Sequence, residues 1–298
     1  MTDRILVPHD GSEAADAAIP WAARLPDSRI TLLRVEPDLG PAIGEISGLD
    51  LETWVSSDVA AAKEELERAA RPLAETGRTV ETTVVVGDDP ADAILAAAEA
   101  EPTRMIVMAT RGRGGAGRLL YGSVADRVAN HATVPVLLVR PGELPAANGR
   151  VLVPLDGSAL AEAALPIGAR LARDLGAPLH LVRVVDPEAI VARIRQRTAS
   201  GEMLPDNAWA LVRGELDDEA REYLARMAAG TGVEATLEVT GGTPAFALLE
   251  LIVPGDVVVM SSHGASGLRR WLRGSVADKL VRESPAPVLL APSRPGAA

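Results

Sequence analysis

Short hydrophobic runs alternate with longer stretches of helix-forming sequence along the N-terminal half of the chain. The runs are rich in Val, Ile and Leu and only a few residues long, which favours strands buried on both faces of a sheet. The stretches between them are rich in Ala, Glu and Leu, as in helices. We therefore expect strands at 5–8, 30–35, 80–86, 104–109 and 134–139, with helices at 12–25, 57–75 and 90–100.

The same series of segments is written a second time in the C-terminal half. The stretch "RILVPHDGSEAADAAIPWAARL" (4–25) returns as "RVLVPLDGSALAEAALPIGARL" (150–171), and "MIVMATRG" (105–112) returns as "VVVMSSHG" (257–264). The later segments "YGSVADRV" and "VPVLLVRP" return as "RGSVADKL" and "APVLLAPS". The repeat unit has the size of a domain and is too long for a solenoid repeat. The chain is therefore predicted to contain two copies of one domain.

Alternation of strands and helices predicts a parallel sheet with helices on both faces. Each half is expected to be a five-stranded, Rossmann-like α/β sandwich domain. Ser12 and Ser158 stand where helix N-caps belong. The segment "PGELPAANG" is rich in Pro and Gly and is typical of a linker. The expected boundaries are domain 1 at 1–141, a linker at 142–149 and domain 2 at 150–298.

Composition restricts the classes of function. The 298 residues carry a net charge of -11, which disfavours broad nucleic-acid binding. The absence of cysteine excludes disulfides and thiolate chemistry. The first residues contain no long apolar stretch of the kind that a secretory signal needs, and no apolar run is long enough to span a membrane. These features predict a soluble, cytoplasmic protein without a membrane partner.

An aspartate follows the first strand of each half, in "PHDGS" and "PLDGS". Ligands of such sheets bind outside the carboxyl ends of the strands, where the strand order reverses. Asp10 and Asp156 therefore have two interpretations. They fix the turn before the next helix, or they accept hydrogen bonds from a ligand or bind a metal ion. Their recurrence in both halves favours the second interpretation.

A glycine-rich segment follows the fourth strand of each half and leads into a helix. Glycine lets backbone N–H groups approach a ligand closely, and a helix N-terminus offers unpaired N–H groups and the positive end of its dipole. Together these features form an anion site, most commonly for phosphate. The alternative is a surface loop followed by a serine N-cap. The residues concerned include Gly112, Gly122, Ser123, Gly264, Gly274 and Ser275.

A carboxylate and a phosphate site at one sheet edge repel each other. Asp10 is therefore expected at the other end of the ligand, or linked to the phosphates through Mg²⁺. A molecule with a donor-bearing base at one end and phosphates at the other is a nucleotide.

The chain resembles a tandem universal stress protein of the UspA-like family, whose domains belong to the adenine nucleotide alpha hydrolase-like folds. The family's ATP-binding signature is Gly, two residues, Gly, nine residues, Gly, then Ser or Thr. The second and third glycines match at Gly112 and Gly122, and again at Gly264 and Gly274. The first glycine is replaced by Ala109 in one half and by Ser261 in the other.

The resemblance implies an ATP site in each half. In the first half, Pro8, Asp10 and Val35 would lie at the adenine, Met108 and Ala109 at the base and ribose, and Gly112, Gly122, Ser123 and Val124 at the phosphates. The matching residues of the second half are Pro154, Asp156, Val184, Met260, Ser261, Gly264, Gly274, Ser275 and Val276. From composition alone, the valines and methionines of this set are ordinary core residues.

The fifth strands, "VPVLLV" and "APVLLA", are apolar and predicted at a sheet edge, which must be covered. In the family such strands pair edge to edge. We expect the fifth strands of the two halves to pair within the chain as an intramolecular pseudo-dimer, and a homodimer of chains is a further expectation.

Three functions are compatible with these features. The first is an ATP-dependent regulator in the stress response that acts on an unidentified protein partner. The second is a slow ATPase or a nucleotidyl- or phosphoryl-transfer enzyme, and the third is a scaffold with inactive sites. The chain has no Walker lysine and no acid repeated inside the glycine loops, so binding is favoured over catalysis and no catalytic residue is assigned.

The remaining features are less specific. The four histidines lack metal-ligand spacing and are expected to be solvated structural residues. The segments at 36–50 and 186–207 differ most between the halves, and both are interpreted as loops that contact a partner or cover a site, or that have simply drifted.

Overall fold

A computed structural model of the protein describes residues 3–38, 51–110, 122–146, 148–261 and 275–292, with side chains from Ser57 onward in the helix that begins at Leu51. The chain forms two compact units, and the sequence passes from the first to the second between Pro145 and Ala146. Each unit has strands and helices of its own.

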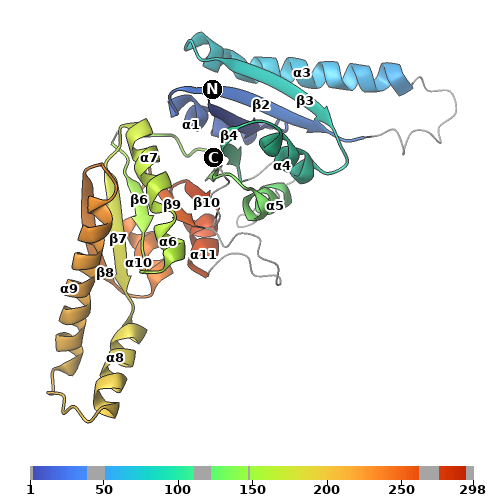
Figure 1. The fold of residues 1–298 in the computed structure, drawn as a ribbon. Helices are drawn as coiled ribbons and strands as arrows, with labels where there is room; N and C mark the ends of the chain where they lie inside the picture. The colour runs from blue at the N-terminus through green and yellow to red at the C-terminus, as the bar shows by residue number, and fades with distance from the viewer. Residues whose placement is uncertain (1–2, 39–50, 111–121, 147, 262–274, 293–298) are drawn as a thin grey trace. The chain divides into compact units, whose positions relative to one another are not determined.

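The first unit is built on a parallel sheet in the order β3-β2-β1-β4-β5 (Figure 1). β1 lies between β2 and β4, so the order of the strands reverses at β1. The predicted α/β class is therefore confirmed in this unit. The strands are β1 (Asp3–Pro8), β2 (Ser28–Glu36), β3 (Val80–Val86), β4 (Thr103–Ala109) and β5 (Val136–Val139).

Helices of the first unit cover the sheet at several strands. One long helix packs on β2 and β3, and two shorter helices pack against each other near β4 and β5. The chain between β1 and β2 begins with a short 3-10 turn instead of one continuous helix, because residues 10–14 form turns. The elements are η1 (Ala15–Ala17), α1 (Ala18–Arg24), α3 (Leu51–Glu75), α4 (Pro90–Ala100) and α5 (Ser123–His131).

The second unit repeats this topology in the order β8-β7-β6-β9-β10. Four of its strands, β6, β7, β9 and β10, are mostly buried and aliphatic, whereas no residue of the outer strand β8 is buried. The strands are β6 (Val151–Pro154), β7 (Leu179–Val185), β8 (Ala235–Gly241), β9 (Val257–Ser261) and β10 (Val288–Ala291). The helices are α6 (Ala159–Glu162), α7 (Leu165–Leu175), α8 (Pro187–Ala199), α9 (Ala208–Ala229), α10 (Pro244–Leu251) and α11 (Ser275–Glu283).

In the second unit α8 and α9 form a helical hairpin, in which α9 packs on β7 and β8 as α3 packs on β2 and β3 in the first unit. The segment expected as a loop at 186–207 contains α8, which Asp186 caps by accepting a hydrogen bond from the amide of Glu188 at 2.9 Å. The base of the hairpin packs around Ile190 and Val212, and ion pairs join Arg193 to Glu219 and Arg197 to Glu215. In Figure 1 the two helices continue past the ends of β7 and β8.

Close approach of α7 to the sheet depends on Gly168. A Cβ on this residue would lie 2.6 Å from Cγ2 of the buried Val153 on β6. Real side chains do not approach so closely, so the helix rests on the sheet here only because residue 168 has no side chain. None of the helices in the described ranges is long and apolar enough to cross a membrane.

Candidate functional site

A tight turn carries an aspartate at the carboxyl end of the first strand in each unit. Oδ1 of Asp10 accepts hydrogen bonds from the amide and the hydroxyl of Ser12, and Oδ1 of Asp156 accepts the same pair from Ser158. The glycine between each pair has φ +77° in the first unit and φ +82° in the second, which a residue with a side chain rarely adopts. Both aspartates therefore fix the turn that follows the first strand, which is the first of the two interpretations of these residues.

The two serines begin their helical segments in different ways. Ser158 is the N-cap of α6, with its hydroxyl 3.1 Å from the amide of Ala161, as predicted. Ser12 accepts a longer bond of 3.3 Å from the amide of Ala15, and the 3-10 turn there begins after Ala14.

His9 connects the first turn to the following helix. It is buried, accepts a hydrogen bond from the amide of Gly11 at Nδ1, and lies 2.9 Å from Asp16 through Nε2. His180 is buried as well and contacts Thr236 and Glu238. The expectation that all histidines are solvated is therefore wrong for these two, because both rings have polar partners inside the fold. His131 is exposed as expected, and His263 lies outside the described residues.

The first-unit candidates lie along the carboxyl edge of its sheet. Pro8 ends β1, Val35 is next to last in β2, and the buried Met108 and Ala109 end β4. Gly112 lies outside the described residues.

The described chain ends at Thr110 after β4 and resumes at Gly122 beside it. The amide of Gly122 donates to the carbonyl of Thr110 at 2.8 Å, and a Cβ on Gly122 would lie 3.2 Å from that oxygen. α5 begins directly afterwards, with Gly122 as its N-cap, so the predicted helix start is confirmed. Ser123 and Val124 occupy its first turn, which leaves the Ser123 hydroxyl exposed.

The second-unit candidates surround a single cavity of about 250 Å³. This volume lies slightly below the range of about 300–1,000 Å³ for small-molecule sites. Seven of the nine candidates line it: Pro154, Asp156, Val184, Met260, Ser261, Ser275 and Val276. The other two, Gly264 and Gly274, lie outside the described residues.

Several lining residues were not expected. They come from the turn after β6, from α6, from the middle of β7, from α10 and from α11, and they are mostly apolar: Leu155, Ser158, Leu160, Ala161, Val182, Pro244, Leu248 and Ala277. Pro244 and Leu248 belong to "EVTGGTPAFALL", the counterpart of "VVVGDDPADAIL". The repetition of this segment in both halves could therefore have predicted that α10 contributes residues to the site.

Ser261 is the second-unit residue that replaces the first signature glycine. It ends β9 and lines the cavity, and its Oγ is buried without a hydrogen-bond partner among the described residues. Unpaired buried hydroxyls are uncommon because each forfeits its hydration.

Arg183 lies behind the Asp156 turn. Its guanidinium is 3.4 Å from the carbonyl oxygen of Leu155, and a Cβ on Gly157 would lie 3.0 Å from its Nη1. Burial acts to raise the pKa of Asp156, but hydrogen bonds from Ser158 and the charge of Arg183 outweigh it and lower that pKa. The carboxylate at this edge of the cavity is therefore held in its ionised form.

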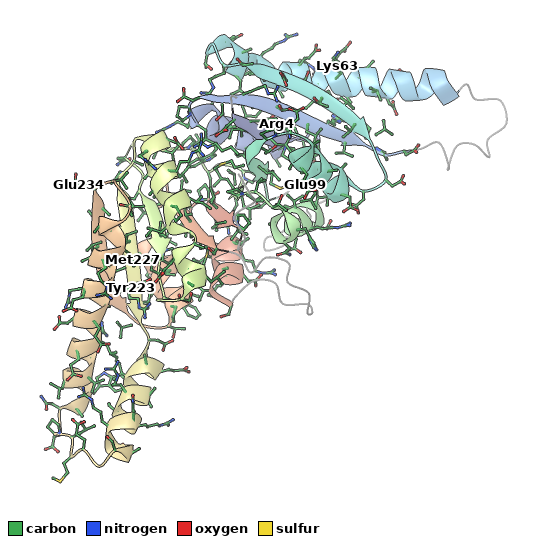
Figure 2. All side chains as sticks on the ribbon, viewed as in Figure 1. Arg4, Lys63, Glu99, Tyr223, Met227 and Glu234 are labelled. Carbon is green, nitrogen blue, oxygen red and sulfur yellow. The ribbon has the colours of Figure 1, made fainter. Side chains whose placement is uncertain are left out.

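Tyr223, labelled in Figure 2, lies on α9 and presents its ring to the guanidinium of Arg183. Its hydroxyl donates to Glu162 of α6 at 3.0 Å. Burial, followed by this bond to a carboxylate, raises the pKa of Tyr223 to about 12. The phenol thus stays protonated and joins α9 to the helix that carries Leu160 and Ala161 into the cavity.

The helices that begin at the two candidate anion sites are held by different chemistry. Arg127 of α5 contacts the carboxylates of Asp89 and Asp92 at the start of α4. The corresponding residue of α11, Lys279, lies 4.2 Å above the ring centroid of Phe246 on α10. In the parts of the chain that are described, no group of three or more His, Cys, Asp or Glu side chains is arranged to hold a metal ion.

Comparison with known proteins gives one family for both halves. The universal stress protein family model matches residues 1–140 and 147–292. A universal stress protein of Mycolicibacterium smegmatis is 29% identical over 298 residues, covering 96% of each chain. Another, from Mycobacterium tuberculosis (strain CDC 1551 / Oshkosh), is 30% identical over 317 residues, covering 96% of this chain and 94% of the relative.

A solved structure shows the same fold over the full chain. The crystal structure of a universal stress protein from Archaeoglobus fulgidus DSM 4304 matches with a TM-score of 0.70 at 22% identity, covering 99% of this chain and 100% of that one. Because the family model matches nearly the whole sequence in two successive copies, the chain belongs to the universal stress protein family.

Proposed function

We propose that the protein is an ATP-binding regulator of the stress response, with one nucleotide site in each unit. The observation that carries the proposal is the cavity of the second unit. Residues from β6, β7, β9 and α11, far apart in sequence, meet around it at the carboxyl ends of the strands. Sheets of this kind use that edge to bind nucleotides.

The two ends of the cavity suit the two ends of a nucleotide. Both bonds from Ser158 end at Oδ1 of Asp156, so Oδ2 can accept a hydrogen bond from an amino group on a base. At the other end the first turn of α11, with Ser275 and Val276, offers backbone N–H groups and a hydroxyl to phosphates. The apolar side chains between them suit the faces of the base and sugar.

The first unit offers the same groups at the same edge. Asp10 forms the same turn, and α5 begins at Ser123 as α11 begins at Ser275. We propose that Pro8, Val35, Met108 and Ala109 contact the nucleoside there. Mg²⁺ would accompany the phosphates and supply the cation that an aspartate and a triphosphate at one edge require.

Regulation by binding is favoured over catalysis by the lining of the cavity. Asp156 is the one charged side chain among the described lining residues. Phosphoryl transfer requires neutralisation of the developing charge and a positioned base or water. A slow ATPase, a transferase and an inactive scaffold are therefore the alternatives that the experiment must distinguish from an ATP-binding regulator.

The test is calorimetric titration of the full chain with ATP, with and without Mg²⁺. Asp156→Asn keeps an oxygen for Ser158 but removes the charge, and it is expected to weaken ATP binding by about tenfold, equivalent to the loss of one charge-assisted hydrogen bond. Asp218→Ala removes an exposed carboxylate of α9 that pairs only with Arg221 in the described structure, and serves as the control.

Three results separate the alternatives. ATP binding that is weakened by Asp156→Asn and unaffected by Asp218→Ala supports the nucleotide site. Sustained ADP release over many turnovers would support an ATPase, and no binding at millimolar ATP would support the scaffold.

The regulatory part of the proposal concerns partners and location. We propose that ATP occupancy changes assembly of the chain or its contact with a protein partner in the cytoplasm. Light scattering after gel filtration, with and without ATP, tests for a nucleotide-dependent homodimer, and cell fractionation tests the location. A constant mass and an unchanged set of bound proteins in both conditions would contradict regulation by nucleotide.

A further inference from the structure

The hydroxyl of Ser261 is buried at the cavity and has no hydrogen-bond partner among the described residues. The residue lines the cavity from the end of β9. The backbone of the same residue is in register with Ala291 of the neighbouring strand. The main chain of Ser261 therefore takes part in the pairing of β9 with β10, while its side-chain hydroxyl forms no hydrogen bond with the described residues.

A buried hydroxyl without a partner lowers stability, because it has lost its water and gained no protein group. Alanine at the same position would avoid this cost, and alanine does stand at the matching position of the first unit, Ala109. The two units thus differ by one oxygen atom at equivalent places in their sites.

The place of Ser261 in the sheet indicates which part of a ligand it meets. β9 lies between β6, which leads into the Asp156 turn, and β10, which follows α11. Asp156 therefore lies on the β6 side of Ser261. The first turn of α11 belongs to the segment that leads into β10, which is the strand on the other side of β9. A nucleotide with its base at Asp156 and its phosphates at α11 has its sugar between them, at Ser261.

We infer that the Ser261 hydroxyl hydrogen-bonds a hydroxyl of the nucleotide's sugar, which makes the second unit selective for ribonucleotides over deoxyribonucleotides. The inference rests on the proposed nucleotide site. A serine hydroxyl both donates and accepts, so it pairs with either the 2′ or the 3′ hydroxyl of ribose. The first unit has a methyl group at this position and lacks this means of discrimination.

Sites built to hydrogen-bond a substrate hydroxyl reject the analogue that lacks it, because their own polar group is then left unpaired. We expect one such bond to be worth about tenfold in affinity at an open site. The preference should be limited to the second unit and should depend on a single oxygen.

The experiment is calorimetric titration of the full chain with ATP, 2′-deoxy-ATP and 3′-deoxy-ATP. The wild-type protein is expected to bind at least one deoxy analogue about tenfold more weakly than ATP at one class of site. Ser261→Ala should weaken ATP binding to the level of that analogue and remove the preference. Ala109→Ser should add the preference to the first unit.

Thr31→Val is the matched control. Thr31 is a buried residue of β2 whose Oγ1 is also unpartnered among the described residues, and it belongs to the other unit. This variant should leave every ratio of nucleotide affinities unchanged. Neither Thr31→Val nor Ser261→Ala should lower the melting temperature of the ligand-free protein, since neither removes a hydrogen bond.

The outcomes separate this inference from the proposed function. If the three nucleotides bind the wild-type protein equally, or if Ser261→Ala keeps the wild-type preference, the inference is wrong and the nucleotide sites stand. If no nucleotide binds, the proposed function fails and the inference fails with it. A lower melting temperature for ligand-free Ser261→Ala would show that the hydroxyl serves the fold and would also overturn the inference.

Discussion

The guanidinium of Arg183 lies over the ring of Tyr223, with its central carbon 5.4 Å from the ring centroid. The same guanidinium lies against the turn that carries Asp156. The corresponding residue of the first unit, Arg34, instead forms ion pairs with Glu36 and Glu65. The matching arginines of the two units therefore serve different ends, one supporting a candidate site and the other joining a strand to a helix.

Arg183→Met is expected to raise the pKa of Asp156, because it removes the positive charge nearest to that carboxylate. Carbon-detected NMR titration of aspartate-labelled protein measures the change. Tyr223→Phe keeps the ring beneath Arg183 and removes only the bond to Glu162, so it should leave the Asp156 titration in place. Identical titration curves for Arg183→Met and wild type would show that Ser158 alone sets this pKa.

Asp256→Asn is expected to destabilise the second unit by about 2–4 kcal/mol, as when one member of a buried ion pair is removed. The Asp256 side chain is 1% exposed and bonds both the backbone and the guanidinium of Arg150. Urea denaturation at neutral pH measures the loss. A cost below about 0.5 kcal/mol, typical of a surface substitution, would contradict the assigned role.

The same pair predicts a pH dependence. Burial acts to raise the pKa of Asp256, but the bonds from Arg150 and Val253 outweigh it and hold that pKa below its usual value of 3.8. A carboxylate with a lowered pKa in the fold contributes stability above its unfolded pKa and loses it as the pH falls through the folded value. The stability difference between wild type and Asp256→Asn should therefore be constant near neutral pH and shrink below about pH 4.

Gly168→Ala is expected to destabilise the protein by about 1–3 kcal/mol through overpacking, because the new methyl group would collide with Val153. Gly214→Ala is the matched control. Gly214 is an exposed residue of α9, and a methyl group there would meet no atom within 4 Å beyond the adjoining backbone of its own helix, so alanine should stabilise by about 0.5–1 kcal/mol. Chemical denaturation of both variants should give shifts of opposite sign, and a shared sign would refute the packing argument.

The attachment of α5 to α4 should depend on salt. Arg127→Met removes contacts to two exposed carboxylates, so its effect on the melting temperature should be largest at low ionic strength and fade in 1 M NaCl, where the Debye length is about 3 Å. Phe246→Leu in the second unit changes no charge and removes a ring instead. Its effect should vary less with salt, and equal salt dependence of the two variants would contradict this distinction.

Most of the strands were predictable from the sequence because they are short, largely aliphatic runs repeated in the other half, whereas their side-by-side order in each sheet was not predicted. The starts of α5 and α11 were predictable for the same reason, since "GSVAD" occurs in both halves. The helix α8 was missed because its segment, 186–207, differs so much from its counterpart at 36–50 that both were interpreted as loops. Asp186 followed by Pro187 is nevertheless an N-cap followed by a helix-initiating proline, a signal that was present in the sequence.

Other features depend on strand register, which the sequence does not state. His180 is buried because Thr236 and Glu238 of the adjacent strand meet its two ring nitrogens. Arg183 reaches the Asp156 turn because alternate residues of β7 face opposite sides, so that Val182 and Val184 line the cavity while Arg183 lies behind it. Pairing of the two fifth strands remains a prediction.

The hairpin of α8 and α9 has an uneven distribution of buried residues. Its packed residues extend outward only as far as Ile194, and none of residues 195–211 is buried, with Met203 96% exposed. The outer turns therefore lack the contacts that slow local opening. Their amide hydrogens should exchange with deuterium well before those of β7 and β8, so the hairpin is expected to unravel from its tip while the sheet behind it stays intact.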